Sequence, residues 1–154
     1  MRRRSIDERM KWRTLEEVDY LFGGINSLSN EFRVILARAM CKIPRNIVEW
    51  AADKLLFISS SDEYFAFALS KKEWKHKTGF IFLSECLKYE SEEKQAFTIA
   101  HELAHHKLKH KTPIFSNLTE EETKRQEDEA DALANKWLRS DSEVRVPHSL
   151  DSPF

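Results

Sequence analysis

The chain has 154 residues, of which 41% are apolar and 33% are charged, and these values are typical of one soluble domain with a single core. Its formal net charge of −1 argues against nucleic acid or an anionic membrane as a partner. No apolar run is long enough to span a membrane and no apolar signal core follows the basic start at Met1–Ser5, so we expect a cytoplasmic protein.

Three helices are predicted in the first third of the chain. Apolar residues at helical spacing predict one helix over residues 9–22, ended by two glycines, and a second over about 30–41. Pro44 stands where the first turn of a third helix, about 45–53, would begin. Cys41 lies in this part and Cys86 lies far from it, and we expect both to be reduced core thiols rather than a disulfide framework.

The middle of the chain changes to short runs that are rich in aromatic residues. They lie at Lys54–Ser59, Tyr64–Leu69 and Phe80–Leu83, and Ser, Asp, Lys and Gly bound them. Such runs are typical of strands, so we expect a small three-stranded sheet, mostly antiparallel or mixed.

Two long helices are predicted after the sheet. Ser91 is a suitable N-cap for a helix over about 92–109, which Pro113 would stop. Thr119 and Glu122 have the spacing of a capping box, which predicts the start of a last helix that runs to about residue 139.

The order of the elements predicts an α+β domain, because helices come first, then a sheet, then two further helices. We divide the chain into an N-terminal helical segment at 1–43, a core at 44–140 and a loosely ordered tail at 141–154. The tail is polar and contains two prolines.

The first of the two long helices carries His101-Glu102-x-x-His105. Residues four apart lie on the same face of a helix, so the two imidazoles can bind one zinc ion. Glu102 projects about 100° round the helix, where it can act as general base on a water at the open side of the metal. The alternative is a surface helix with solvated histidines, because His106 and His110 make the whole segment rich in histidine.

A catalytic zinc site needs a third protein ligand, and the last helix offers several acids. Its apolar stripe centres near Ala130, so Glu127 lies about 50° from the stripe and Glu129 about 110° from it on the other side. Because a carboxylate that faces the core needs a partner, we predict Glu127 as the ligand and Glu129 as a surface charge. Asp131, one turn beyond Glu127, is predicted to accept the free ring N–H of a ligating histidine.

These two motifs resemble the gluzincin metallopeptidases, and most closely the ImmA/IrrE family of small metallopeptidases. The resemblance rests on one motif at residues 97–105 and a second at residues 127–134, and it covers about residues 44–138. It implies a minimal zincin-like domain, in which a small sheet packs on an active-site helix and a C-terminal helix, and which cleaves specific protein targets, often transcriptional repressors. Three departures are Ala104 where the family often has Gly, Asp131 where it often has Asn, and a missing Leu-Met-Pro after the second motif. The matching motifs are Phe97-Thr98-Ile99-Ala100-His101-Glu102-Leu103-Ala104-His105 and Glu127-x-Glu129-Ala130-Asp131-x-Leu133-Ala134.

The sequence therefore predicts a zinc metallopeptidase that acts on a protein or peptide. Glu102 would take a proton from water and pass it to the leaving amine. We expect the strand Phe80–Leu83 to form the rim of the cleft, where an extended substrate would add as a further strand. The donor to the oxyanion stays open among four residues: Tyr64, His76, Tyr89 and His148.

Two other functions compete with this prediction. One is a catalytically silent zinc-binding domain that acts in regulation or protein interaction, and the other is a helical binding protein without metal. Glu102 favours the enzyme, because a site that only holds zinc would not need it.

Overall fold

The computed structural model describes residues 17–18, 21–22, 29–60, 66–69, 79–112 and 116–145. The helix expected over residues 9–22 lies mostly outside these ranges, although Glu17, Val18 and Leu21 are helical. The expected tail from residue 146 onward also lies outside the described residues.

Two helices precede the sheet at the positions that the sequence predicts. Helix α3 spans Asn30–Cys41, and the Oγ of Ser29 caps it by accepting from the N–H of Phe32 at 3.3 Å. Helix α4 spans Arg45–Lys54, with Pro44 as its N-cap residue. Both bury one apolar face, and Phe32 is fully buried, because an amphipathic helix is stabilised mainly by packing.

The sheet consists of β1 (Leu55–Ser60), β2 (Ala66–Leu69) and β3 (Gly79–Ser84), in the order β1-β3-β2. Strand β3 pairs with β1 in parallel and with β2 in antiparallel orientation. Because β3 lies between its two neighbours, its backbone groups are already paired on both sides. The expectation that Phe80–Leu83 accepts a substrate as a further strand is therefore wrong. Among the described strands, β1 and β2 form the two edges of the sheet.

Helix α6 spans Glu92–Lys107 and follows a 3₁₀ helix, η1 (Glu85–Tyr89), that the sequence analysis missed. The Oγ of Ser91 accepts from the N–H of Lys94 at 3.2 Å, so the predicted N-cap is observed. The helix ends two residues earlier than expected, and Lys109 beyond it adopts a positive φ of 57°.

Helix α7 spans Glu120–Arg145, so it continues past the predicted end near residue 139 and into the segment that we assigned to the tail. Its start is as predicted. The N–H of Glu122 donates to the Thr119 Oγ1 at 3.1 Å, and the N–H of Thr119 donates to the Glu122 carboxylate at 3.0 Å. This reciprocal pair is a capping box.

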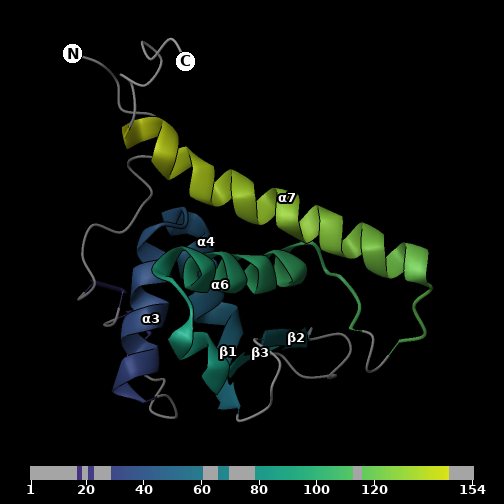
Figure 1. The fold of residues 1–154 in the computed structure, drawn as a ribbon, viewed down its shortest axis with the longest axis horizontal. Coiled ribbons are helices and arrows are strands. Elements are labelled where there is room, and N and C mark those ends of the chain that lie inside the picture. Colours follow the sequence, from purple (N-terminus) through teal and green to yellow (C-terminus); the bar gives the residue numbers. More distant parts are fainter. Residues whose placement is uncertain are drawn as a thin grey trace.

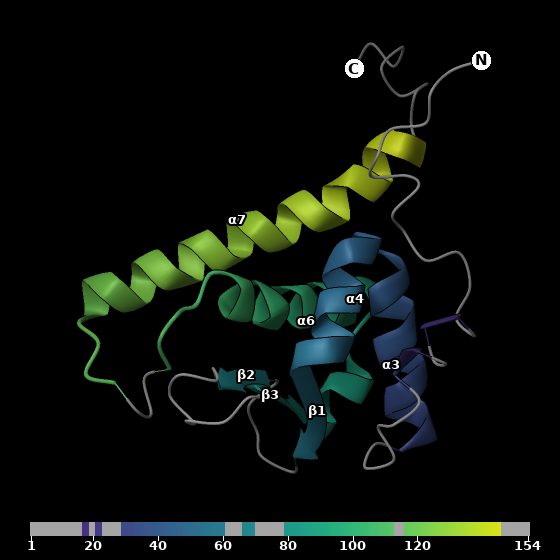
Figure 2. The same cartoon turned by 180° about the vertical axis from the view of Figure 1, so that it is seen from behind.

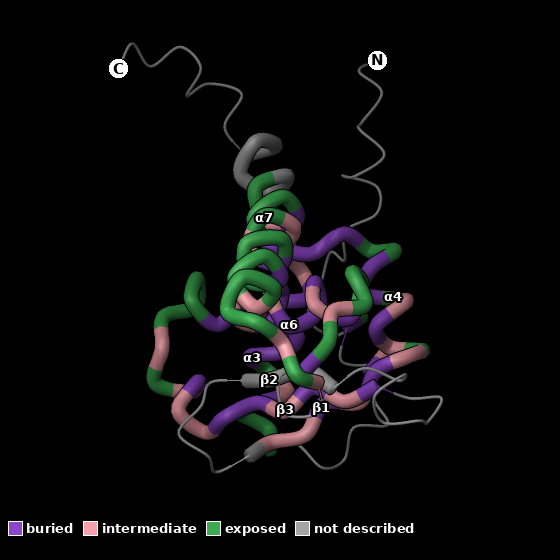
Figure 3. The backbone as a smooth tube through the Cα atoms, turned by 90° about the vertical axis from the view of Figure 1, so that its right-hand side faces the viewer, coloured by how far each residue is buried: buried purple, intermediate pink, exposed green. Residues whose placement is uncertain are grey.

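Helix α6 lies at the centre of the fold, with the sheet on one side and α7 across the other (Figures 1 and 2). Helix α3 packs beside α6, and the buried segments gather where these elements meet, while the outer face of α7 is exposed (Figure 3). The α+β class is confirmed. The largest fully buried core side chains include Phe32, Phe57, Met40, Ile43, Ile81, Leu83, Leu87, Ile99 and Leu103.

Two further expectations concern the chain as a whole. Cys41 and Cys86 are both partly buried, and neither forms a disulfide. Among the described residues, no helix has the length and apolarity that crossing a membrane requires.

Candidate metal centre

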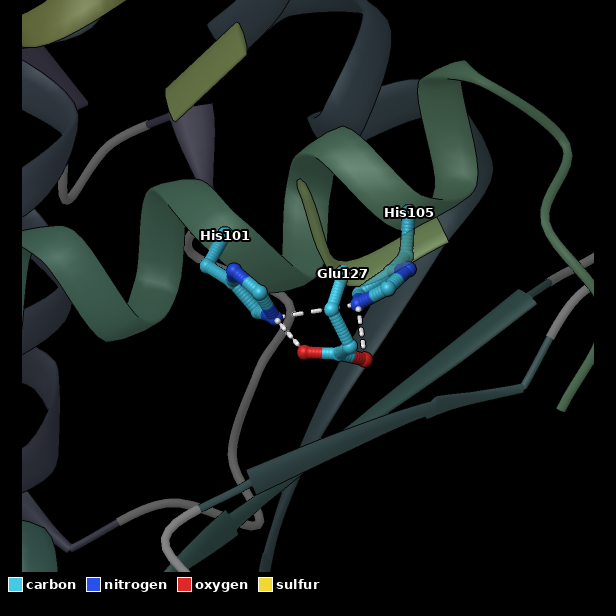
Figure 4. A group of neighbouring side chains, drawn as sticks. All are labelled: His101, His105 and Glu127. Atoms are coloured by element: carbon cyan, nitrogen blue, oxygen red, sulfur yellow. Dashed lines mark hydrogen bonds and ion pairs between the residues drawn. The ribbon is translucent and has the colours of Figure 1, made fainter. Parts of the chain in front are cut away.

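Two imidazoles project from the same face of α6 towards α7 (Figure 4). His101 and His105 are one turn apart, and their side chains are only 15% and 14% exposed. The rings meet edge to face with their centroids 4.6 Å apart, and the two Nε2 atoms are 3.0 Å from each other. The predicted pair therefore converges on one point in space.

Glu127 of α7 completes this group. Its Oε2 lies 3.1 Å from the Nε2 of His101, and its Oε1 lies 3.2 Å from the Nε2 of His105. The donor atoms of the three residues all lie within 4.8 Å of one another, which a metal ion can bridge. Ligand atoms at about 2.0–2.2 Å from a tetrahedral zinc ion would lie about 3.3–3.5 Å apart, so the observed spacing fits zinc after a small expansion.

Burial does not distinguish the acids of α7, contrary to the reasoning from the sequence. The side chains of Glu127, Glu129 and Asp131 are 52%, 48% and 50% exposed. Glu127 therefore does not face the core, because the buried residues described in α7 are Gln126, Ala130, Ala134 and Trp137, and the carboxylates flank them. The three acids differ in the histidines that they contact: Glu127 contacts His101 and His105, Asp131 contacts His101, and Glu129 contacts His110.

Asp131 contacts the outer nitrogen of the first histidine. Its Oδ1 lies 2.8 Å from the Nδ1 of His101. A carboxylate only accepts, so the Nδ1 of His101 donates to Asp131, and in a neutral imidazole the Nε2 then keeps a lone pair towards Glu127. This is the contact that the sequence analysis expected of Asp131.

Two residues of the motif, His105 and Glu102, have strongly shifted pKa values. Burial, helped by the neighbouring imidazoles of His101 and His110, lowers the pKa of His105 to about 3. The imidazole of His105 is therefore neutral at neutral pH. Burial, and after it the Glu127 carboxylate, raises the pKa of Glu102 to about 8.

Glu102 is only 7% exposed. Among the residues that the structure describes, no hydrogen bond or ion pair of its carboxyl group is observed. A buried carboxyl group without a partner is costly, and such groups concentrate at functional sites.

The sequence analysis missed two residues on the far side of His105. The Nδ1 of His110 lies 2.9 Å from the Nδ1 of His105, and the Nε2 of His110 lies 2.7 Å from the Oε2 of Glu129. The spacing of Glu129 from Asp131, two residues apart on α7, was the available signal. It indicates that the two carboxylates lie on different sides of the helix, so each could serve a different histidine.

Partly buried polar contacts join helix α6 to the sheet and helix α7 to the loop that follows α6. The Nε2–H of His106 donates to the carbonyl of Phe80 at 3.0 Å, and Gly79 leaves the space for that ring. The amide side chain of Gln126 accepts from the N–H of Lys111 at 2.8 Å and donates to its carbonyl at 2.9 Å. These contacts fix α6 and α7 on either side of the three donor atoms.

Three of the four candidates for the oxyanion donor, Tyr64, His76 and His148, lie outside the described residues. Tyr89 ends η1 and is 89% exposed.

One of three comparisons with known proteins found a match. Residues 61–145 match the peptidase family described as the IrrE N-terminal-like domain, and the match confirms the resemblance to the ImmA/IrrE family. No curated protein and no solved structure matches the chain.

Proposed function

Because the chain belongs to the IrrE N-terminal-like domain family of peptidases, we propose that it is a zinc-dependent metallopeptidase. It hydrolyses a peptide bond in a specific protein target, such as a transcriptional repressor or another regulator. The observation that carries the proposal is the convergence of His101, His105 and Glu127 on one point.

The donor set suits a zinc ion. Asp131 holds a proton on the Nδ1 of His101. In the neutral imidazole, the lone pair of Nε2 then faces the Oε2 of the Glu127 carboxylate at 3.1 Å. Two such electron-pair donors repel unless a cation or a proton lies between them. Two neutral histidines and one glutamate form a known ligand set of catalytic zinc, with a position left for water.

The proposed base is Glu102. Zinc would supply a Lewis acid that polarises the substrate carbonyl and makes water more acidic. Glu102 would accept the proton of the attacking water and deliver it to the leaving amine. A nearby divalent cation favours the ionised form of a carboxyl group, so the raised pKa of Glu102 would fall towards the range of a general base when the ion binds.

We further propose that an extended substrate pairs with β2. This strand lies at one edge of the sheet and contacts α6, and among the described residues only β3 pairs with it. A peptide that adds to such an edge gains main-chain hydrogen bonds with little demand on its sequence. Residues 44–140 would then form the catalytic core, with the segment 1–43 packed on it through α3, in a cytoplasmic protein.

The test is a comparison of zinc content and hydrolysis in matched variants. Protein purified without a histidine tag should hold about one zinc ion per chain. Glu102→Gln should keep the zinc and lose cleavage of a regulator that the parent cleaves, whereas Glu93→Gln, at an exposed position of the same helix, should keep both.

Three results would contradict the proposal. A parent protein that binds no zinc would support a metal-free binding function. Cleavage by Glu102→Gln at the parent's rate would show that another group is the base. A zinc-loaded parent that cleaves none of the regulators encoded beside it would favour the silent regulatory domain.

A further inference from the structure

We propose that His110 and Glu129 form a positioning arm that holds the imidazole of His105 ready to bind the metal. The inference rests on the proposed function, because it assigns a role to two residues next to a proposed ligand. His110 and Glu129 would act through His105 and touch neither the ion nor the substrate.

The geometry of the arm is a continuous line of three side chains. The Nδ1 atoms of His105 and His110 are 2.9 Å apart, and the rings meet at 67° with their centroids separated by 5.1 Å. The far nitrogen of His110, Nε2, lies 2.7 Å from the Glu129 carboxylate. The side chain of His110 is only 7% exposed, so water competes little for these contacts.

The positions of the protons along the arm follow from the contact between His110 and Glu129. A carboxylate only accepts, so the Nε2 of His110 must donate to Glu129. A neutral His110 then has a bare Nδ1, which accepts from the Nδ1–H of His105. The Nε2 of His105 is left with a lone pair that points at Glu127, as a metal ligand requires.

The backbone brings His110 into this place. Its N–H donates to the carbonyl of His105 at 3.0 Å, and the positive φ of Lys109 turns the chain back after the helix ends. The next residue, Lys111, is fastened to α7 by the two hydrogen bonds of the buried Gln126. His110 therefore lies between α6 and α7 because both its own turn and its neighbour hold it there.

The arm is the counterpart of the contact between Asp131 and His101. Helix α7 would supply three carboxylates with distinct tasks: Glu127 binds the ion, Asp131 orients the first histidine directly, and Glu129 orients the second through His110. The Nδ1–H groups of His101 and His105 then both donate hydrogen bonds. The three atoms that would bind the ion, the two Nε2 atoms and a Glu127 oxygen, all carry lone pairs.

The first test measures zinc affinity by competition with a chelator. His110→Ala and Glu129→Leu should each weaken zinc binding about 10- to 100-fold, which is the usual effect of removing such a partner. Glu129→Gln keeps an oxygen that accepts from His110, so it should restore most of the affinity that Glu129→Leu loses. Glu121→Leu, an exposed position on the same helix, should match the parent.

The second test follows the ring protons in the cobalt(II)-substituted protein by NMR. In the parent, the Nδ1–H protons of His101 and His105 should both exchange slowly with solvent. In His110→Ala and in Glu129→Leu, the proton of His105 should exchange faster while that of His101 is unchanged. A general loosening of the fold would affect both protons alike, so the difference between them isolates the arm.

The outcomes separate the two proposals. If the parent binds neither zinc nor cobalt, the proposed function fails and the arm fails with it. If the parent binds both ions and all variants match it in affinity and exchange, only the arm is overturned. Should His110→Ala not fold, Glu129→Leu at its half-exposed position decides the question by the same two measurements.

Discussion

The buried carboxyl group of Glu102 makes a strong prediction about the zinc-free protein. Its pKa is about 8 in the folded state against an ordinary value of 4.5. Between these values the folded chain binds more protons than the unfolded chain, so its stability falls as the pH rises. Each pKa unit corresponds to about 1.4 kcal/mol, so the parent should lose roughly 2–3 kcal/mol between about pH 5.5 and about pH 7.5 through this group.

Glu102→Gln removes this loss, because an amide of the same shape does not ionise. The free energy of unfolding of the variant should exceed that of the parent by an amount that grows by roughly 2–3 kcal/mol over the same pH range. The assay is urea denaturation of both proteins after removal of zinc. The pKa of His105 is lowered, so its own contribution runs the opposite way and is gained as the pH rises, but it is present in both proteins and largely cancels in the difference.

The matched control is Glu93→Gln, which removes an exposed carboxyl group from the same helix. Its difference from the parent should not change with pH. A difference between Glu102→Gln and the parent that is equally flat would refute the argument, because Glu102 would then ionise in the folded protein as easily as in the unfolded chain.

Three more substitutions test how the site is supported. Gly79→Ala should cost about 1–3 kcal/mol in urea denaturation, because a Cβ there would lie 2.8 Å from the Cε1 of His106, and an unchanged stability would mean that the ring moves aside freely. Gln126→Ala should cost about 1–3 kcal/mol and speed hydrogen exchange at the Lys111 amide, because it removes both hydrogen bonds that the Lys111 backbone makes with this side chain. Protection equal to the parent's would contradict this. Ala130→Leu should weaken zinc binding as well as lower stability, because extra volume at a fully buried position pushes α7 from α6; parent-like zinc affinity would show that the helices tolerate the separation.

Local signals in the sequence predicted where the elements begin. Ser91 and the pair Thr119 and Glu122 act through side chains within three residues of the backbone groups that they satisfy, so neighbouring residues suffice to recognise them. The end of α7 was predicted too early for a related reason. Ser140 is no strong stop, and the better signal is Pro147, which disfavours helix at the residue before it.

Contacts between distant segments could not be predicted in the same way. The central position of β3 depends on a pairing with β1 that joins residues more than 20 apart in the chain, and no local pattern encodes it. His110 lies beyond the end of α6, so helical periodicity does not describe where its ring points. Glu129 was assigned to solvent because its angle on α7 points away from the apolar stripe, but the chain after α6 turns back and brings His110 to meet it.

The proposed centre depends on how closely α6 and α7 approach each other. Ala100 and Ala104 of α6 and Ala130 and Ala134 of α7 are all fully buried, and α7 makes most of its contacts with α6. Small side chains let two helix backbones come near, and only then can carboxylates that flank the buried stripe of one helix reach imidazoles on the other. Ala104 stands where the resembling family often has Gly, and its methyl group is fully buried while Glu127 still lies within reach of both imidazoles.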